Sequence, residues 1–156
     1  YDGDTSVIHL EKKSKINGLS CKQSAQVTAE QVMQILRGDV AWLQESEEPL
    51  LREFYTKLVN QGLRPKTIVD YTREAFTYAP GNVRVTMDYD IRTGMYGLDF
   101  LNAECVTLPI IENHRILEVK WDAYLPDCIR SAVQLGNQGT QSFSQYAACR
   151  AYEYVG

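Results

Sequence analysis

The sequence predicts a single α+β domain over residues 1–156, with a mostly antiparallel sheet and helices packed on its apolar side. Four segments alternate apolar with charged or polar residues at a period of two, which is typical of strands that bury one face. Tight-turn dipeptides separate neighbouring strand segments, and amphipathic stretches with helix-capping residues lie among them. We find no internal repeat, low-complexity tract or linker that would divide the chain.

The N-terminal part of the chain predicts a β-hairpin. A strand is expected over residues 5–15, and an Asn-Gly turn signal at 17–18 leads into a partner strand over 19–27. An Asp-Gly turn signal at residues 2–3 comes directly before the first strand. We therefore expect that a preceding strand is missing and that the chain is a fragment or a processed product.

Two helices are predicted after this hairpin. Thr28 and Gln31 have the spacing of a capping box, in which each side chain bonds the backbone N–H of the other residue. The apolar stripe that follows ends at Gly38, a typical C-terminal stop. Ser46 is expected to cap a longer helix that has Pro49 near its start.

The second half of the chain predicts further strands and two more helices. In order, we expect a strand ending near residue 76, a strand over 82–91 after a Pro-Gly turn, a short strand within 105–109, a strand over 115–121, a helix over 126–135 and a helix over 142–152.

Composition limits the possible partners. The formal net charge is −4, so the chain as a whole does not attract nucleic acid, and an anion site must be built locally from a few cations. No apolar run is long enough to cross a bilayer, and no signal peptide is evident. The four cysteines are widely spaced, without metal-ligand spacing, which favours reduced thiols and a cytoplasmic location.

Charged residues alternate along the predicted strands so that each strand has one charged face. These faces carry His9, Glu11 and Lys13 on the first strand, Arg84, Thr86 and Asp88 on the third, and Glu118 and Lys120 on the last. If the strands share one sheet, a single surface presents lysine, arginine and glutamate side by side. A polyanion accompanied by metal ions requires such a surface.

Each of these groups also has a structural interpretation. Lysines on an exposed edge strand prevent aggregation, which would account for Lys12, Lys13, Lys15 and Lys22 without any ligand. Glu118 and Lys120 can form a surface ion pair of little energetic value. Glu11 and Glu118 nevertheless lie inside apolar strands rather than in turns, and carboxylates are the ligands that Mg²⁺ and Mn²⁺ prefer.

Arg73 and Arg84 lie on two strands joined by a tight turn. Pairing of these strands is expected to bring the two arginines close together, where like charges repel. An anion between them would relieve that repulsion. Two separately solvated surface arginines remain the alternative.

The motifs together resemble those of bacterial VTC-domain proteins, named for the vacuolar transporter chaperone. The resemblance covers essentially the whole chain in the correct order, on the segments Leu-Glu-Lys-Lys-Ser-Lys-Ile-Asn-Gly at 10–18, Arg-Pro-Lys-Thr-Ile-Val-Asp-Tyr-Thr-Arg at 64–73, Val-Arg-Val-Thr at 83–86, Ile-Leu-Glu-Val-Lys-Trp at 116–121 and Ser-Phe-Ser-Gln-Tyr-Ala-Ala-Cys-Arg at 142–150. The family belongs to the triphosphate tunnel metalloenzymes. The resemblance therefore implies an antiparallel β-barrel with helices on its outer face, here incomplete at the N-terminus, whose lumen binds phosphate chains with Mn²⁺ or Mg²⁺.

The resemblance also implies roles for individual residues. Lys13, Lys22, Arg73, Arg84 and Lys120 are similar to the basic lining that holds phosphates, Glu118 to the metal-binding glutamate, and Glu11 to an assisting acid. The residues expected to carry catalysis are Lys13, Arg73, Arg84 and Glu118. Gln145 stands where the family usually has lysine, so it can hydrogen-bond phosphate but cannot neutralise it.

The implied activity is transfer of the terminal phosphoryl group of ATP to a polyphosphate chain. A tunnel triphosphatase that hydrolyses inorganic or nucleoside triphosphate differs only in the acceptor. A polyphosphate-binding module without catalysis is favoured by Gln145 and by the missing strands, so whether this chain is an enzyme stays open. A plain interaction domain with solvated charges is the remaining alternative.

Overall fold

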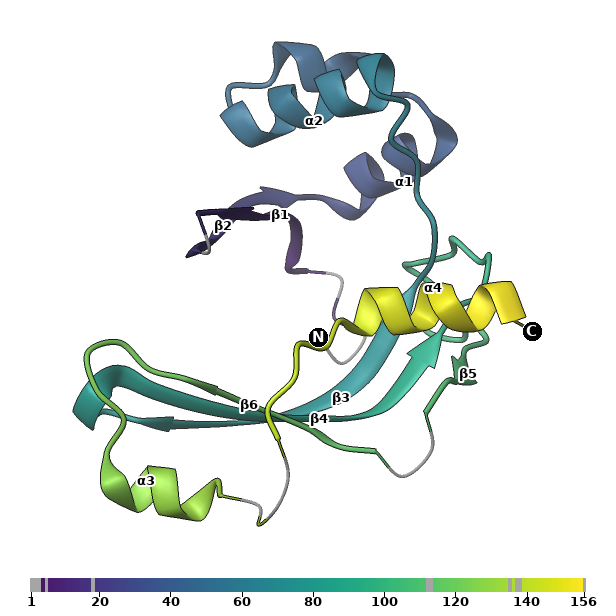
Figure 1. The fold of residues 1–156 in the computed structure, drawn as a ribbon. Coiled ribbons are helices and arrows are strands. Elements are labelled where there is room, and N and C mark those ends of the chain that lie inside the picture. Colours follow the sequence, from purple (N-terminus) through teal and green to yellow (C-terminus); the bar gives the residue numbers. More distant parts are fainter. Residues whose placement is uncertain are drawn as a thin grey trace. The chain divides into compact units, whose positions relative to one another are not determined.

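A computed structural model of the protein describes residues 4, 6–17, 19–111, 114–134, 136 and 139–155. These residues form two compact units, residues 1–66 with 98–104 and residues 67–97 with 105–156, which are described separately below (Figure 1). The predicted turn at residues 2–3, Gly18 of the hairpin turn and Leu135 at the end of a predicted helix lie outside the described residues.

Unit 1 is built on the predicted hairpin. Strand β1 (Ile8–Ile16) pairs antiparallel with β2 (Leu19–Val27), in a register that sets Leu10 opposite Ala25 and Lys13 opposite Lys22. The pairing confirms the first two predicted strands. Since side chains alternate along each strand, the register also gives the hairpin one apolar face and one charged face.

Helix α1 (Ala29–Arg37) begins and ends as predicted. The Thr28 hydroxyl accepts a hydrogen bond from the N–H of Gln31 at 3.2 Å, and the Gln31 side chain accepts one from the N–H of Thr28 at 2.9 Å. Gly38 ends the helix in the left-handed conformation at φ 84°, which glycine adopts without steric cost. The predicted capping box is therefore confirmed.

The start of the second helix differs from the prediction. A short 3₁₀ helix, η1 (Ala41–Glu45), precedes α2 (Pro49–Asn60), and the N-cap residue of α2 is Glu48 rather than Ser46. Proline at the first helical position places the cap one residue before it, so Ser46 stands too early in the chain. The Ser46 hydroxyl instead accepts a hydrogen bond from the N–H of Glu48 at 3.2 Å.

The core of unit 1 lies between the apolar face of the hairpin and the helices. Its buried residues are Ile8, Ala25 and Val27 from the strands and Leu43, Leu50, Leu51 and Leu58 from η1 and α2. Beside this core, Lys12 forms an ion pair with Glu53 of α2 at 2.6 Å. With its apolar face covered, the hairpin leaves its charged face exposed to solvent.

Unit 2 is built on a four-stranded sheet centred on β4 (Val83–Thr93). Strand β3 (Val69–Tyr78) pairs along one side of β4, while β6 (Ile116–Lys120) and the two-residue β5 (Leu108–Pro109) pair along the other. All of these pairings are antiparallel. The predicted strands of the second half are thus confirmed, with ends shifted by a few residues.

The β3–β4 turn requires glycine. The turn η2 (Pro80–Asn82) has Gly81 at φ 77°, and a Cβ there would lie 2.4 Å from the backbone oxygen of Tyr124. The N–H of Asp122 also donates to the Gly81 oxygen at 3.1 Å. Because the backbone of Tyr124 approaches so closely, any other residue at position 81 would push the segment after β6 away from the turn.

A β-bulge shifts the alternation of β4. The register changes between Asp70 and Thr72, and Asp90 adopts φ 49°. As a result Asp88 and Thr93 point to the same face of the sheet, although they are five residues apart: Asp88 is opposite Arg73 and Thr93 is opposite Val69.

Helix α4 (Gln145–Val155) lies along the face that carries Asp88 and Thr93, while the shorter α3 (Asp127–Ala132) follows β6 (Figure 1). We expected helices on the apolar face of the sheet. Helix α4 instead packs on the charged face because its own contacting residues, Gln145, Cys149 and Glu153, recur every four positions and are polar or small.

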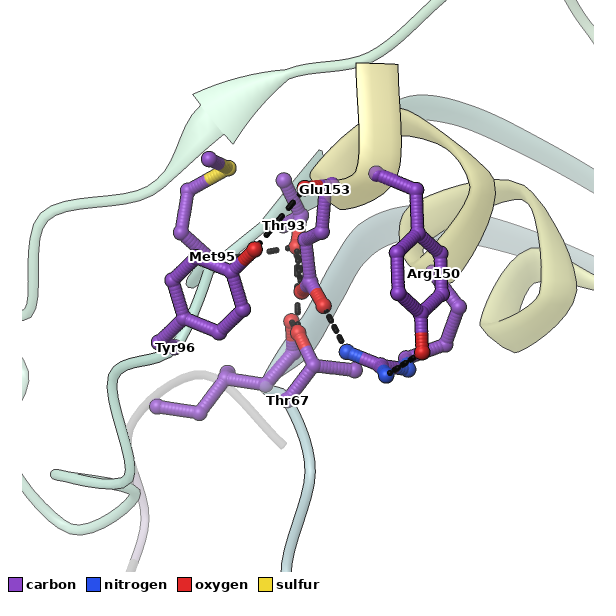
Figure 2. A network of polar contacts seen from close by, with 8 residues as sticks. Thr67, Thr93, Met95, Tyr96, Arg150 and Glu153 are labelled. Carbon is purple, nitrogen blue, oxygen red and sulfur yellow. Dashed lines mark hydrogen bonds and ion pairs between the residues drawn. The ribbon is translucent and has the colours of Figure 1, made fainter. Parts of the chain in front are cut away.

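A buried network fixes the C-terminal half of α4 to the strands (Figure 2). The Glu153 carboxylate accepts a hydrogen bond from the Thr93 hydroxyl at 2.9 Å and pairs with Arg150, and its backbone oxygen accepts one from Tyr96 at 2.9 Å. Burial raises the pKa of Glu153, but the hydrogen bonds from its neighbours outweigh burial, so this pKa lies below its ordinary value. The carboxylate is therefore held in its charged form.

The described strands form a two-stranded sheet and a four-stranded sheet, and neither sheet closes into a barrel. The first predicted strand thus does not share the sheet of the other three, since β1 pairs with β2 in a separate two-stranded sheet of the described residues. The fold is α+β and antiparallel, as predicted. None of the helices in the described ranges is long and apolar enough to span a membrane.

Candidate functional site

The predicted site residues of unit 2 gather on one face of its sheet. The cross-strand rows on this face are Arg73–Asp88–Ile116, Ala75–Thr86–Glu118 and Thr77–Arg84–Lys120, each read from β3 through β4 to β6. Directly opposite residues of antiparallel strands share a face. Gln145 reaches the first row from α4. We call these residues the sheet face.

One end of the sheet face is closed by a fixed cluster. The Arg73 guanidinium donates to both carboxylate oxygens of Asp88, with both distances 2.6 Å, and the Gln145 amide donates to Asp88 at 2.7 Å. The Asp88 side chain is only 3% exposed and that of Arg73 is 27% exposed. Hydrogen bonding to Asp88 raises the pKa of Arg73, and the nearby charge of Glu118 adds to that shift. Such two-pronged pairs are rigid.

The other end of the sheet face is open. Arg84 and Lys120 are exposed and directly opposite each other, and the Lys120 ammonium lies 3.1 Å from the Glu118 carboxylate. Two like charges side by side repel, so an anion placed over Arg84 and Lys120 would be attracted to both. This end of the face therefore has the charge pattern of an anion site.

The expectation that strand pairing brings Arg73 and Arg84 close together is wrong. Arg73 is opposite Asp88, and Arg84 is opposite Thr77, two rows further along the sheet. Residues four positions apart along a strand are separated by about 13 Å. The tight turn at Pro80–Asn82 sets the register between β3 and β4. The sequence predicted where this turn lies, but not which residues of the two strands are opposite each other. The like-charged neighbour of Arg84 is Lys120.

Thr86 lies in the middle row, between Ala75 and Glu118. It is 2% exposed, and its hydroxyl has no hydrogen-bond partner among the residues that the structure describes. Buried hydroxyl groups are normally paired, so this one is an exception that the fold alone does not account for.

The charged face of the unit 1 hairpin holds the remaining predicted residues. The Lys22 ammonium lies 2.5 Å from the Glu11 carboxylate, and Lys13 is directly opposite Lys22. The Lys22 side chain is 58% exposed. Its hydrogen bond lowers the pKa of Glu11, and the charges of Lys22 and Lys13 lower it further. We call this surface the hairpin face.

The chain matches one known family of protein domains along nearly its whole length. The model of the VTC domain matches residues 1–154 of the chain. The chain belongs to the VTC domain family. The family resemblance of the sequence is confirmed in this respect, and the match is consistent with a function related to polyphosphate. A search of curated proteins found no match.

This VTC domain offers few ligands for a resident metal ion. In the described parts of the chain, no group of three or more histidine, cysteine, aspartate or glutamate side chains is placed to hold one. Mg²⁺ is often bound through one or two carboxylates, with phosphate oxygens and water completing its shell. The single carboxylate of Glu118 beside two cations fits an ion that arrives together with phosphate.

Sequence reasoning missed the partners that restrain the predicted residues. Asp88 was placed on the charged face by its alternation, but nothing marked it as the partner of Arg73. Thr86 was placed there too, without a role. The spacing of Gln145 and Glu153, eight residues apart, is a signal that one side of the VTC domain's last helix is polar.

Proposed function

We propose that this VTC domain binds polyphosphate or triphosphate together with Mn²⁺ or Mg²⁺ on its charged faces. We further propose that it transfers the terminal phosphoryl group of ATP to a polyphosphate chain. The observation that carries the proposal is the open end of the sheet face, where Arg84 and Lys120 stand side by side next to the Glu118 carboxylate. The family match supports the class of ligand.

Each of these residues has a distinct role in the proposal. Arg84 and Lys120 hold phosphate oxygens, because both are exposed and neither has a carboxylate as its cross-strand neighbour. Glu118 holds the metal ion when Lys120 turns toward phosphate. Arg73 adds positive charge from the side but keeps its carboxylate partner, since its geometry with Asp88 is two-pronged.

The hairpin face contributes Lys13 and Lys22 as phosphate-binding residues, with Glu11 as their acidic neighbour. We also propose that the phosphate chain binds inside a closed tunnel, as the family resemblance implies. Phosphoryl transfer then depends on positioning and charge neutralisation, without a covalent protein nucleophile. A bound metal ion would supply charge stabilisation at the phosphate oxygens.

A polyphosphate-binding module without catalysis is the second candidate. The observation that favours it is Gln145, which is neutral and already donates its amide hydrogen bond to Asp88. Helix α4 therefore brings no cation to the sheet face at this position. Such a module would bind phosphate chains without turnover.

Product analysis separates these functions. The chain is incubated with ATP and Mn²⁺, and the products are resolved on a gel and assayed for free phosphate. Long polymer supports the polymerase, free phosphate alone supports the triphosphatase, and binding without turnover supports the module. Glu118→Gln should abolish turnover, while Glu45→Gln, an exposed acid in unit 1, should not. A chain that neither binds nor converts phosphate compounds contradicts the whole proposal.

A further inference from the structure

The buried hydroxyl of Thr86 suggests a role that the free protein does not use. Thr86 is almost fully buried, yet its hydroxyl has no partner in the described residues. A valine of nearly the same shape would fill the position without an unpaired polar atom, and it would suit a β-strand equally well. Asp88, two positions along the same face, has its hydrogen bonds satisfied by Arg73 and Gln145. Among the described residues, the Thr86 hydroxyl is the buried polar side-chain group without a partner.

The nearest polar side chain across the sheet is that of Glu118. Thr86 and Glu118 are directly opposite each other on β4 and β6. Such pairs have Cβ atoms about 4.5–5.5 Å apart, which lets a threonine hydroxyl reach a glutamate carboxylate. The Glu118 side chain is 46% exposed, and its carboxylate forms an ion pair with Lys120, which lies two residues along β6 and is 68% exposed. The carboxylate thus has two possible partners, and the free protein uses the exposed one.

We propose that Thr86 is a positioning residue for Glu118. When phosphate draws Lys120 away and a metal ion accompanies it, the Glu118 carboxylate turns toward the sheet, and one of its oxygens accepts a hydrogen bond from the Thr86 hydroxyl. The other oxygen stays free for the metal ion that accompanies the phosphate. A hydrogen bond to one oxygen of a ligating carboxylate fixes its orientation toward the metal. This inference rests on the proposed function.

The arrangement couples the two ligands. Without phosphate, Lys120 occupies the Glu118 carboxylate and opposes a metal ion there. Without metal, a carboxylate released by Lys120 would lie near phosphate as an unneutralised like charge. Each ligand therefore improves the site for the other, and Thr86 acts only in the state that holds both.

Three variants test this role: Thr86→Val removes the hydroxyl and keeps the shape, Thr86→Ser keeps the hydroxyl, and Thr72→Val makes the same change at an exposed residue on the opposite face of β3. For each, the affinity for tripolyphosphate is measured by calorimetry with Mn²⁺ and again with a chelator. Thermal unfolding of the free protein is recorded alongside.

We expect Thr86→Val to unfold at the same temperature as the unaltered chain or higher, since no hydrogen bond is lost in the free protein. Its gain in affinity from Mn²⁺ should fall by about ten-fold or more, the usual effect of losing such a supporting hydrogen bond. Its metal-free affinity should stay within two-fold. Thr86→Ser and Thr72→Val should keep the full gain.

Two results would overturn the positioning role. One is a full metal-dependent gain in Thr86→Val. The other is an equal loss of affinity with and without Mn²⁺, which would mean that the hydroxyl contacts phosphate directly. If Thr86→Val does not fold, Thr86→Ala is measured in its place. Failure of the unaltered chain to bind tripolyphosphate would overturn the proposed function and this inference together, whereas binding that the variants leave intact overturns the inference alone.

Discussion

The hairpin face and the sheet face follow the same sequence pattern but differ in how their charges are held. On the hairpin face, Lys22 and Glu11 form an exposed ion pair on a two-stranded sheet. On the sheet face, Arg73 is fixed by a buried carboxylate that also accepts a hydrogen bond from α4. Alternation therefore shows which side chains share a face, while partners from distant parts of the chain decide which charges are free to bind a ligand.

The largest effect is expected from Asp88→Ala. The substitution leaves the partly buried guanidinium of Arg73 without its acceptor and the Gln145 amide without a partner. We expect the free energy of unfolding to fall by about 2–3 kcal/mol, below the range for a fully buried pair because Arg73 is partly exposed. Urea denaturation measures this. A loss below about 0.5 kcal/mol would show that the cluster does not fix α4.

The next effect concerns ligand binding and compares the two faces directly. Arg84→Ala should weaken tripolyphosphate binding about ten-fold, because an exposed cation at the open end is lost. Lys22→Ala should weaken it by less, since the Lys22 ammonium is already paired with Glu11. Calorimetric titration gives the affinity for tripolyphosphate of each variant, and the two losses are compared. Arg130→Ala on α3 is a control that keeps both faces intact. An equal loss in the two variants would contradict the difference between the faces.

The elements that could be predicted from the sequence are those that depend on nearby residues. The hairpin, the capping box of α1 and the strands around the Pro80–Asn82 turn could be predicted, since each depends on residues close together in the chain. The position of α4 on the charged face could not, because it depends on a bulge near Asp90 that brings Thr93 to the face of Asp88.

The candidate site shows the same limit. Alternation correctly grouped Arg84 with Thr86 and Glu118 with Lys120, because side chains two apart on a strand share a face. The pairing of Arg73 with Asp88 rather than with Arg84 required the register between β3 and β4. The tight turn sets that register, so the register cannot be read from either strand alone.

A smaller effect is expected from acid. The pKa of Glu153 is lowered in the folded protein, so its contribution to stability is present at neutral pH and is lost as pH falls through the folded pKa. The loss should begin below about pH 4.3, where glutamate in an unfolded chain takes up a proton. Thermal unfolding between pH 7 and pH 3 measures it, and Glu153→Gln should show a shallower decline. A decline identical to that of the unaltered chain would exclude Glu153 as the titrating group.

The smallest effect is expected on the hairpin face. Glu11→Gln removes the partner of Lys22, but the pair is exposed and should contribute less than about 0.5 kcal/mol to the free energy of unfolding. Urea denaturation of this variant, set beside Asp88→Ala, contrasts an exposed pair with a buried one. A loss above about 1 kcal/mol would contradict the small contribution expected of an exposed pair.

The most direct test of the central claim is a calorimetric titration of tripolyphosphate with Mn²⁺ into the unaltered chain and into the double variant Arg84→Ala/Lys120→Ala. If the open end of the sheet face is the phosphate site, the unaltered chain binds and the double variant loses at least the ten-fold expected of Arg84→Ala alone. Both proteins should unfold at similar temperatures, because the two side chains are exposed. Equal affinity of the two proteins would contradict the account.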